Sequence, residues 1–479
     1  MSAPLSFLFR PGRAAWLFAT ATCWLTLLMA ILLLRQVLAE GPISYPMGSW
    51  PVPWGIEYRV DILNAYMLVL VAAISAVVMS FAQLIVERRI RLPEHKQPWF
   101  YTAYLLCMTG LLGITITGDA FNVFVFLEIS SLSSYVLISI GRDRRALTAA
   151  YQYLIMGTIG ATFILISIGL MYVMTGTLNM ADLAARLPAV AHTRTIHAAF
   201  AFLTVGVGLK LALFPLHLWL PNAYAYAPSV VTAFLAATAT KVAIYVLLRF
   251  FFTIFGPQFS FETMPLDLIL LPLALIGVFS ASLVAIFQDN IKRMLAYSSV
   301  AQIGYMILGI SFVSVTGLTA SISHLFNHAL MKGTLFMALG CVSFRIGSTQ
   351  LERMAGLGQS MPWTMGAFVI GGLSLIGVPL TAGFISKWYL ILGALEKGWW
   401  PVAVLILLTS LMAVIYIWRV VEVAYFKPAP EGQIVREAPL ALLIPTWTLA
   451  LANLYFGLET SFNAGVARQA AEMLLGVAP

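Results

Sequence analysis

The sequence predicts an all-α, polytopic membrane protein with about 13 transmembrane helices, and three observations support this prediction. Of the 479 residues, 61% are hydrophobic and 10% are charged, whereas soluble proteins have about 45–50% and about 25%. The hydrophobic residues form runs of about 20, the length that crosses a bilayer as a helix. The 27 Lys and Arg and the 19 Asp and Glu are spread singly along these runs, so no basic stripe suggests a nucleic-acid partner. These figures exclude a soluble, disordered or disulfide-stabilised protein.

Thirteen apolar runs, separated by charged residues or by Gly and Pro, define the expected spans. They lie near 14–38, 60–86, 99–117, 120–140, 148–174, 197–219, 229–253, 267–288, 292–313, 316–345, 363–395, 399–426 and 439–458. The first run has no small-residue cleavage site behind it, so we expect a retained anchor rather than a signal peptide. Cys23, Cys107 and Cys341 each lie inside an apolar run without a CxxC spacing, which predicts buried small hydrophobic residues.

The basic residues of the loops predict the orientation, because short cytoplasmic loops carry an excess of Lys and Arg. With thirteen spans, all of the basic loops fall on one side, and they contain Arg10, Arg13, Arg88, Arg89, Arg91, Lys96, Arg142, Arg144, Arg145, Lys292, Arg293, Arg345 and Arg353. The opposite loops, at 39–59, 175–196, 254–266 and 396–400, carry few basic residues. We therefore expect a cell-membrane protein with a cytoplasmic N-terminus and a C-terminus outside.

Eight ionisable residues lie inside the expected spans, where a charge at a helix centre costs roughly 2.5–3.5 kcal/mol. They are Glu128, Lys210, His217, Lys241, His324, His328, Lys332 and Lys387. Single members have simpler explanations: Lys241 or Lys387 could extend its head group to the interface, His217 could be a packing residue, and Glu128 could be a structural partner of one lysine. Taken together, however, eight separate costs of burying a charge in lipid would be large. The sequence therefore favours an arrangement in which these groups face each other or water rather than lipid.

Ionisable groups that face each other and water are what a proton pathway requires. Desolvation favours the neutral form of a lysine and a neighbouring carboxylate favours the charged form, so moving the partner toggles the proton. Histidine titrates near neutrality and exchanges protons through two ring nitrogens. The spacing i, i+4, i+8 of His324, His328 and Lys332 places all three on one helix face. The eight residues are therefore candidates for a proton-transfer file.

Prolines near two of the lysines predict interrupted helices. Lys210 is followed by Pro215, and Lys387 is preceded by Pro379; a proline removes a helical hydrogen bond, and the freed carbonyls must find partners in protein or water. The two lysines occupy the fourth helix of two successive five-helix blocks, and an odd number of spans inverts one block relative to the other. The expected organisation is N-terminal helices at 1–98, a first repeat at 99–253, a second repeat at 267–426, and a C-terminal helix and tail at 427–479.

Five segments in order, GDAFNVFVFLEI, LKLALFPLHLWLPNAYAYAPS, TKVAIYVLLR, NHALMKGTLF and GVPLTAGFISKW, resemble the antiporter-like subunits shared by Mrp cation/proton antiporters, membrane-bound hydrogenases and respiratory complex I. The resemblance covers roughly residues 40–455 and implies two inverted five-helix repeats, each with a broken helix. It implies that Glu128 is the glutamate of the input half-channel and that Lys210 is its broken-helix partner. Lys241 is similar to the next relay lysine.

The resemblance extends to the second half of the proposed file. His324, His328 and Lys332 fall on the family's central histidine–lysine helix, and Lys387 matches the terminal lysine of the output half-channel. Two departures stand out: the family begins with one more apolar helix, and many relatives place an acidic residue and a histidine where Asn222 and Tyr224 stand.

The resemblance leaves two members open, the D subunit of an Mrp antiporter and the smallest complex I homologue, and GVPLTAGFISKWYL and GDAFNVFVFLEI favour the D subunit. Lys387 stands where the middle antiporter-like subunit of complex I has glutamate, and the chain stops about twenty residues after its last expected span, unlike the longer Mrp A and largest complex I subunits. We expect a proton-translocating subunit of a multisubunit Na⁺ or K⁺/proton antiporter that works with other membrane subunits. The alternative is a proton-pumping subunit of a complex I-type NADH-quinone oxidoreductase or of a membrane-bound hydrogenase.

No motif in the sequence points to a cofactor, a metal or bond-making chemistry. There is no cysteine cluster for iron–sulfur binding, no Walker A sequence and no Rossmann fingerprint. The expected partners are lipid, protons and other membrane subunits, with no nucleic acid and no cofactor.

Overall fold

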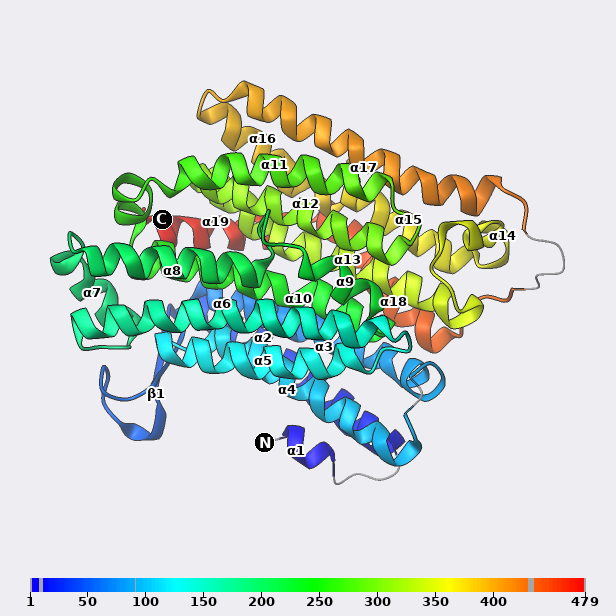
Figure 1. Ribbon diagram of the computed structural model, residues 1–479, viewed down its shortest axis with the longest axis horizontal. Helices are drawn as coiled ribbons and strands as arrows, with labels where there is room; N and C mark the ends of the chain where they lie inside the picture. Colours follow the sequence, from blue (N-terminus) through cyan, green and yellow to red (C-terminus); the bar gives the residue numbers. More distant parts are fainter. Residues whose placement is uncertain (1, 8–11, 91, 430–434, 478–479) are drawn as a thin grey trace.

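The computed structural model describes residues 2–7, 12–90, 92–429 and 435–477, and these residues form an all-α helical bundle (Figure 1). The first half contains α1 (Ser2–Ser6), α2 (Gly12–Glu40), α3 (Ile62–Arg88), α4 (Gln97–Ile116), α5 (Ala120–Ser139), α6 (Arg145–Thr175), α7 (Met180–Val190), α8 (Arg194–Leu211), α9 (Trp219–Tyr226) and α10 (Ser229–Leu248). The second half contains α11 (Leu266–Ile286), α12 (Ile291–Ser311), α13 (Val315–Ile346), α14 (Leu357–Ser360), α15 (Pro362–Ile376), α16 (Ala382–Glu396), α17 (Trp400–Phe426), α18 (Leu440–Leu458) and α19 (Ser461–Leu475).

Eleven helices of the described residues are long and apolar enough to cross a membrane. The two other expected spans, 197–219 and 363–395, are each divided into two shorter helices, α8 with α9 and α15 with α16. This division explains why the structure has fewer unbroken spans than the thirteen expected. The chain is therefore a multi-span membrane protein.

The second break shows why the chain cannot continue as one helix. At the end of α15, Gly377 adopts φ +90°, a left-handed conformation that glycine reaches without a side-chain clash, and Pro379 follows two residues later. Gly383 then packs against the end of α15, where an added Cβ would lie 1.8 Å from the carbonyl oxygen of Ser374. The two half-helices can approach this closely only because position 383 has no side chain.

Helix α13 lies at the centre of the bundle and is buried along nearly its whole length. It packs against α3, α10, α12, α15, α16, α18 and α19. Because protein surrounds α13, its polar side chains face other helices rather than lipid.

A hairpin and a C-terminal helix were not expected from the sequence. A short antiparallel hairpin, β1 (Ile43–Pro46) and β2 (Glu57–Val60), pairs Ile43 with Val60 in the loop after α2. The segment expected as a tail forms α19, which packs against α13 and α3 and has 15 residues. The moderate hydropathy and short length of α19 explain why a search for apolar runs of about 20 residues misses it.

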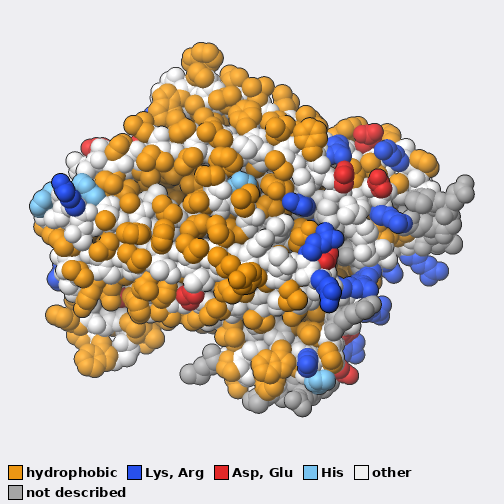
Figure 2. Space-filling model, in the orientation of Figure 1, with side chains coloured by type: hydrophobic (Ala, Val, Ile, Leu, Met, Phe, Trp, Pro, Cys, Tyr) orange, Lys and Arg blue, Asp and Glu red, His pale blue; other side chains and the backbone are white. Residues whose placement is uncertain are grey.

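Basic and apolar side chains occupy different parts of the surface. Apolar side chains cover most of the visible face, and Lys and Arg gather at the end drawn on the right (Figure 2). Arg89, Arg142 and Arg293, from three of the expected basic loops, line one cavity at that end. Arg10 and Arg91, which were assigned to the same side, lie outside the described residues.

A buried polar cluster ties α3 to α4 and α10 near the opposite end of the bundle. The Arg249 guanidinium, which directly follows α10, forms an ion pair with Asp61 and also donates to the side-chain oxygen of Asn64. Asp61 is the N-cap of α3 and accepts from the backbone N–H of Leu63 and Asn64 at 3.0 and 3.1 Å. The Tyr245 hydroxyl donates to the Thr115 carbonyl of α4 at 3.0 Å. The cluster supplies partners for a charge that lipid cannot solvate.

We expect Asp61→Asn to destabilise the folded protein by about 3–5 kcal/mol, because the buried guanidinium of Arg249 loses its counter-charge. Asparagine keeps the N-cap interaction of α3, so the change isolates the charge. The matched control is Asp182→Asn, which removes a more exposed ion pair to Arg186 at 2.9 Å and should alter stability by less than about 1 kcal/mol. Thermal unfolding of the purified variants measures both effects, and equal stability of the two variants would contradict this account.

Candidate functional site

Glu128 and Lys210 form an ion pair inside the first half of the bundle. The Lys210 Nζ lies 3.5 Å from the Glu128 Oε1 and donates a hydrogen bond to the Ser131 hydroxyl at 2.8 Å. The lysine side chain is 5% exposed and the glutamate side chain is 25% exposed. Ser131 lies three residues after Glu128, so both face the lysine from the same side of α5. Lys210 occupies the last turn of α8, where a cation is favoured by the helix dipole.

His217 lies between α8 and α9 and is separate from this pair. Its ring stacks on Phe214 at a centroid distance of 5.3 Å and meets Tyr297 of α12 edge-on at 6.5 Å. Its Nδ1 atom is buried and has no hydrogen-bond partner among the described residues. The His217 ring therefore lies where the segment between α8 and α9 contacts α12.

Lys241 is fully buried in the middle of α10. Its Nζ donates to the Ala236 carbonyl at 2.5 Å and lies 3.5 Å from the Thr240 hydroxyl. Within the described ranges no carboxylate lies within salt-bridge distance of this lysine. Helix α10 packs on α13, the helix that carries His328 and Lys332.

The polar face of α13 contains the two histidines and the lysine that the spacing predicted. The His324 and His328 rings are nearly parallel, at 9°, with centroids 5.9 Å apart. One turn further along, the Lys332 Nζ donates to the Leu295 carbonyl at 2.7 Å and to the Ser298 hydroxyl at 2.5 Å, both on α12. The one-face arrangement of these three residues is thus present in the structure.

His324 bridges α12 and α16, whereas His328 makes no such contact. The ring nitrogens of His324 lie 2.7 Å from the Ser386 hydroxyl and 2.9 Å from the Gln302 amide oxygen. Both ring nitrogens of His328 are buried and have no hydrogen-bond partner in the described part of the chain. Of the two rings, only that of His324 is hydrogen-bonded to neighbouring helices among the described residues.

Lys387 lies on α16 directly after Ser386 and reaches back to the preceding half-helix. Its Nζ donates to the carbonyls of Leu375 and Ile376 at 3.1 and 2.8 Å, and to the Ser410 hydroxyl at 3.0 Å. The last carbonyls of α15 have no helical donor because the helix ends there. The ammonium group donates to these carbonyls in place of a backbone N–H, and it also lies 4.9 Å above the Tyr305 ring.

The structure therefore joins the predicted residues in two groups. One group is Glu128 with Lys210. The other is the α13 face, with Lys241 on the adjacent α10, and its His324 contacts Ser386, the residue before Lys387. In the described residues, no hydrogen bond or ion pair joins Lys210 to Lys241.

Several residues that hold these groups were missed from the sequence. They are the hydroxyl and amide side chains of Ser131, Ser298, Gln302, Ser386 and Ser410, together with Tyr305. Ser298 and Gln302 are spaced i, i+4 on the apolar α12, a pattern that indicates a polar helix face. Among the described residues no group of three or more His, Cys, Asp and Glu is placed to hold a metal ion.

Comparison with known proteins places the chain in one family. The family described as "NADH:quinone oxidoreductase/Mrp antiporter, TM" matches residues 117–413. The chain is 41% identical over 455 residues to the N subunit of NADH-quinone oxidoreductase from Desulforudis audaxviator, covering 92% of this chain and 90% of the relative. It is 31% identical over 400 residues to the D subunit of the Na⁺/H⁺ antiporter from Alkalihalophilus pseudofirmus, covering 84% and 79%.

A solved structure shares the fold over almost the whole chain. One chain of the Mrp complex from Dietzia sp. superposes with a TM-score of 0.88 at 25% identity, covering 97% of this chain and 93% of that one. With the family match over residues 117–413, these similarities identify the chain as a member of the NADH:quinone oxidoreductase/Mrp antiporter transmembrane family.

Proposed function

We propose that the chain is a proton-translocating membrane subunit of a multisubunit Na⁺ or K⁺/proton antiporter. The single observation that carries this proposal is the ion pair of Glu128 and Lys210, in which a buried lysine at the end of an interrupted helix meets a partly exposed carboxylate. A carboxylate in contact with a lysine favours the charged ammonium, and separation of the pair in a dry site favours release of the proton. A pair that moves apart and together thus takes up and releases one proton in each cycle.

The other ionisable groups supply positions to which this proton can move. We propose that the path runs from Glu128 and Lys210 through Lys241 and the His324, His328 and Lys332 face to Lys387, with His217 beside the first break. Support comes from the carbonyl and hydroxyl acceptors around the lysines, which accept a hydrogen bond from either the ammonium or the neutral amine. His324 has contacts on both ring nitrogens and can exchange a proton between them.

Partner subunits belong to this function for a physical reason. A proton path alone would dissipate the gradient, so cation exchange requires coupling to a second site or a gate. The outer helices carry apolar side chains that face outward, including Leu407, Leu411 and Trp418 of α17. Such side chains suit either lipid or a neighbouring membrane subunit.

A second candidate is a subunit of a quinone-reducing redox complex. The 41% identity to the N subunit of an NADH-quinone oxidoreductase exceeds the 31% identity to the D subunit of a Na⁺/H⁺ antiporter. The same proton path would serve either complex. Its residues only move protons, and any redox centre would belong to another subunit.

We expect Glu128→Gln to lower proton-coupled transport by about a hundredfold or more, the lower end of what positioned proton-transfer groups contribute. The amide keeps the shape of the carboxylate but carries no charge to hold the proton on Lys210. Transport is measured in vesicles containing the assembled complex, and Glu94→Gln in an exposed loop is the control that should transport normally. Wild-type transport by a correctly assembled Glu128→Gln complex would refute the proposed role.

The two candidate complexes are distinguished by the subunits that purify with the chain. For an antiporter we expect only membrane subunits, together with exchange of Na⁺ or K⁺ driven by a pH gradient. Co-purification of proteins with iron–sulfur signals in electron paramagnetic resonance, together with quinone reduction, would instead establish the redox complex.

We also propose that the basic end of the bundle faces the cytoplasm and that the C-terminus lies outside. The excess of Lys and Arg at one end supports this orientation, and α19 ends at the opposite side of the bundle (Figure 1).

Labelling of intact cells with a membrane-impermeant maleimide tests the orientation, because Cys23, Cys107 and Cys341 are all buried. A cysteine replacing the exposed His192 should be labelled in intact cells. One replacing Glu94, at the basic end, should be labelled only after the cells are opened. The reverse pattern would show that the orientation is inverted.

A further inference from the structure

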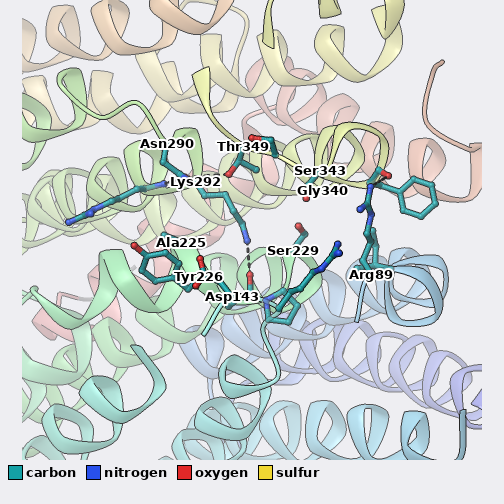
Figure 3. A pocket seen from close by; sticks show the side chains of 18 of the residues that line it. Arg89, Asp143, Ala225, Tyr226, Ser229, Asn290, Lys292, Gly340, Ser343 and Thr349 are labelled. Carbon is teal, nitrogen blue, oxygen red and sulfur yellow. Dashed lines mark hydrogen bonds between the residues drawn. The ribbon is translucent and has the colours of Figure 1, made fainter. Parts of the chain in front are cut away.

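A cavity of about 450 Å³ opens at the basic end of the bundle (Figure 3). Its walls come from the residues after α3 and α5 and from the N-termini of α10 and α12, with the last turns of α13 on another side. None of the eight residues proposed for proton transfer lines it. The proton path therefore leaves this cavity without a role.

The walls carry a strong excess of positive charge. Five cationic side chains line the cavity, Arg89, Arg142, Arg145, Lys292 and Arg293, against one carboxylate among the described residues, Asp143. Asp143 is already engaged, since its Oδ2 lies 3.5 Å from the Arg145 Nε. The Arg89 guanidinium donates to the Phe344 carbonyl, and burial together with the nearby positive charge of Arg142 lowers its pKa.

Several hydrogen-bond donors at this cavity lack an anionic acceptor. The Nε atom of Arg293 is buried and has no hydrogen-bond partner in the described residues. Lys292 is 6% exposed and points into the cavity (Figure 3), where its Nζ donates to the Ala227 carbonyl at 2.7 Å. No carboxylate within the described ranges lies within salt-bridge distance of it.

A helix N-terminus adds to the positive potential. Helix α10 begins at Ser229, which lines the cavity, and its N-cap residue is Pro228, which makes no side-chain cap. The first N–H groups of a helix carry partial positive charge and have no acceptor within the helix. Arginine pairs, a buried lysine and such an N-terminus together form the donor set that phosphate oxygens favour.

We propose that this cavity binds a phosphate-bearing anion. The volume lies within the range of about 300–1,000 Å³ typical of small-molecule sites, which is large enough for a phosphate group and its substituent. Guanidinium groups bind phosphate oxygens in a bidentate geometry, and one doubly charged group would compensate Arg142 and Arg293 at once. The phosphate group belongs either to a soluble ion or to the headgroup of an anionic lipid. Basic pockets at the membrane surface attract such headgroups.

The test uses the full chain, purified with the subunits that accompany it, at constant ionic strength so that screening does not change. Thermal unfolding is followed while inorganic phosphate or phosphatidylglycerol is added, with chloride and phosphatidylcholine as the respective blanks. We expect one of the two probes to raise the unfolding temperature of the wild type, because a ligand that binds only the folded state stabilises it.

The variants are Arg142→Gln alone and Arg142→Gln with Arg293→Gln; the single change affects an exposed residue, so it keeps the test valid if the double variant fails to fold. We expect the concentration needed for half of the shift to rise about tenfold or more, as for loss of a charge-assisted hydrogen bond. Lys397→Gln, which removes one exposed positive charge after α16, should respond as the wild type does.

The outcomes separate the two sources and the alternative. A shift with phosphatidylglycerol alone supports a lipid headgroup, and a shift with inorganic phosphate supports a soluble anion. Absence of a shift with both probes, or an equal response in the Arg142→Gln variant, overturns the proposal and leaves the cavity to an acidic segment of a partner protein.

Discussion

Most polar groups inside this bundle find a partner within the protein, and much of the architecture follows from that constraint. Lipid supplies no hydrogen bonds, so an unsatisfied carbonyl or ammonium group costs several kcal/mol. The protein meets the constraint by placing α13, which carries His324, His328 and Lys332, at the centre with seven helices packed around it. The apolar helices that surround it then present their remaining faces outward.

The four buried lysines of the proposed proton path satisfy this constraint in two different ways. Lys210 has a carboxylate 3.5 Å away, whereas Lys241, Lys332 and Lys387 donate to backbone carbonyls and hydroxyls. An ion pair stabilises the charged form of a lysine specifically, while a carbonyl accepts from both the charged and the neutral forms. The pair with Glu128 is thus the position at which a shift of a helix would most change the preference of a lysine for its proton.

The breaks in the helices are part of the same solution. Interrupting a span exposes carbonyls, and at α15 those carbonyls become the acceptors for Lys387. The cation and the break therefore compensate each other: the helix end needs donors and the buried ammonium needs acceptors. This explains why the lysine lies beside the interruption rather than in an unbroken span.

Much of the fold and part of the candidate site could be predicted from the sequence. Span length and hydropathy predicted the all-α membrane class, and Pro379 predicted the break before Lys387. The i, i+4, i+8 spacing predicted the common face of His324, His328 and Lys332. The short amphipathic α19 and the polar supports Ser386 and Gln302 were missed, because a serine or glutamine in an apolar run acquires meaning only from what packs opposite it.

Residue order alone establishes which segments enter the membrane, where helices are interrupted and which segments carry ionisable groups, since these depend on local hydropathy and backbone chemistry. Which of those groups meet follows from the packing of the helices. Contacts between Glu128 and Lys210 or between His324 and Ser386 join residues 82 and 62 positions apart, and no local pattern specifies such contacts. The same is true of the Arg249 pair with Asp61 and of the cavity lined by cations from separate loops.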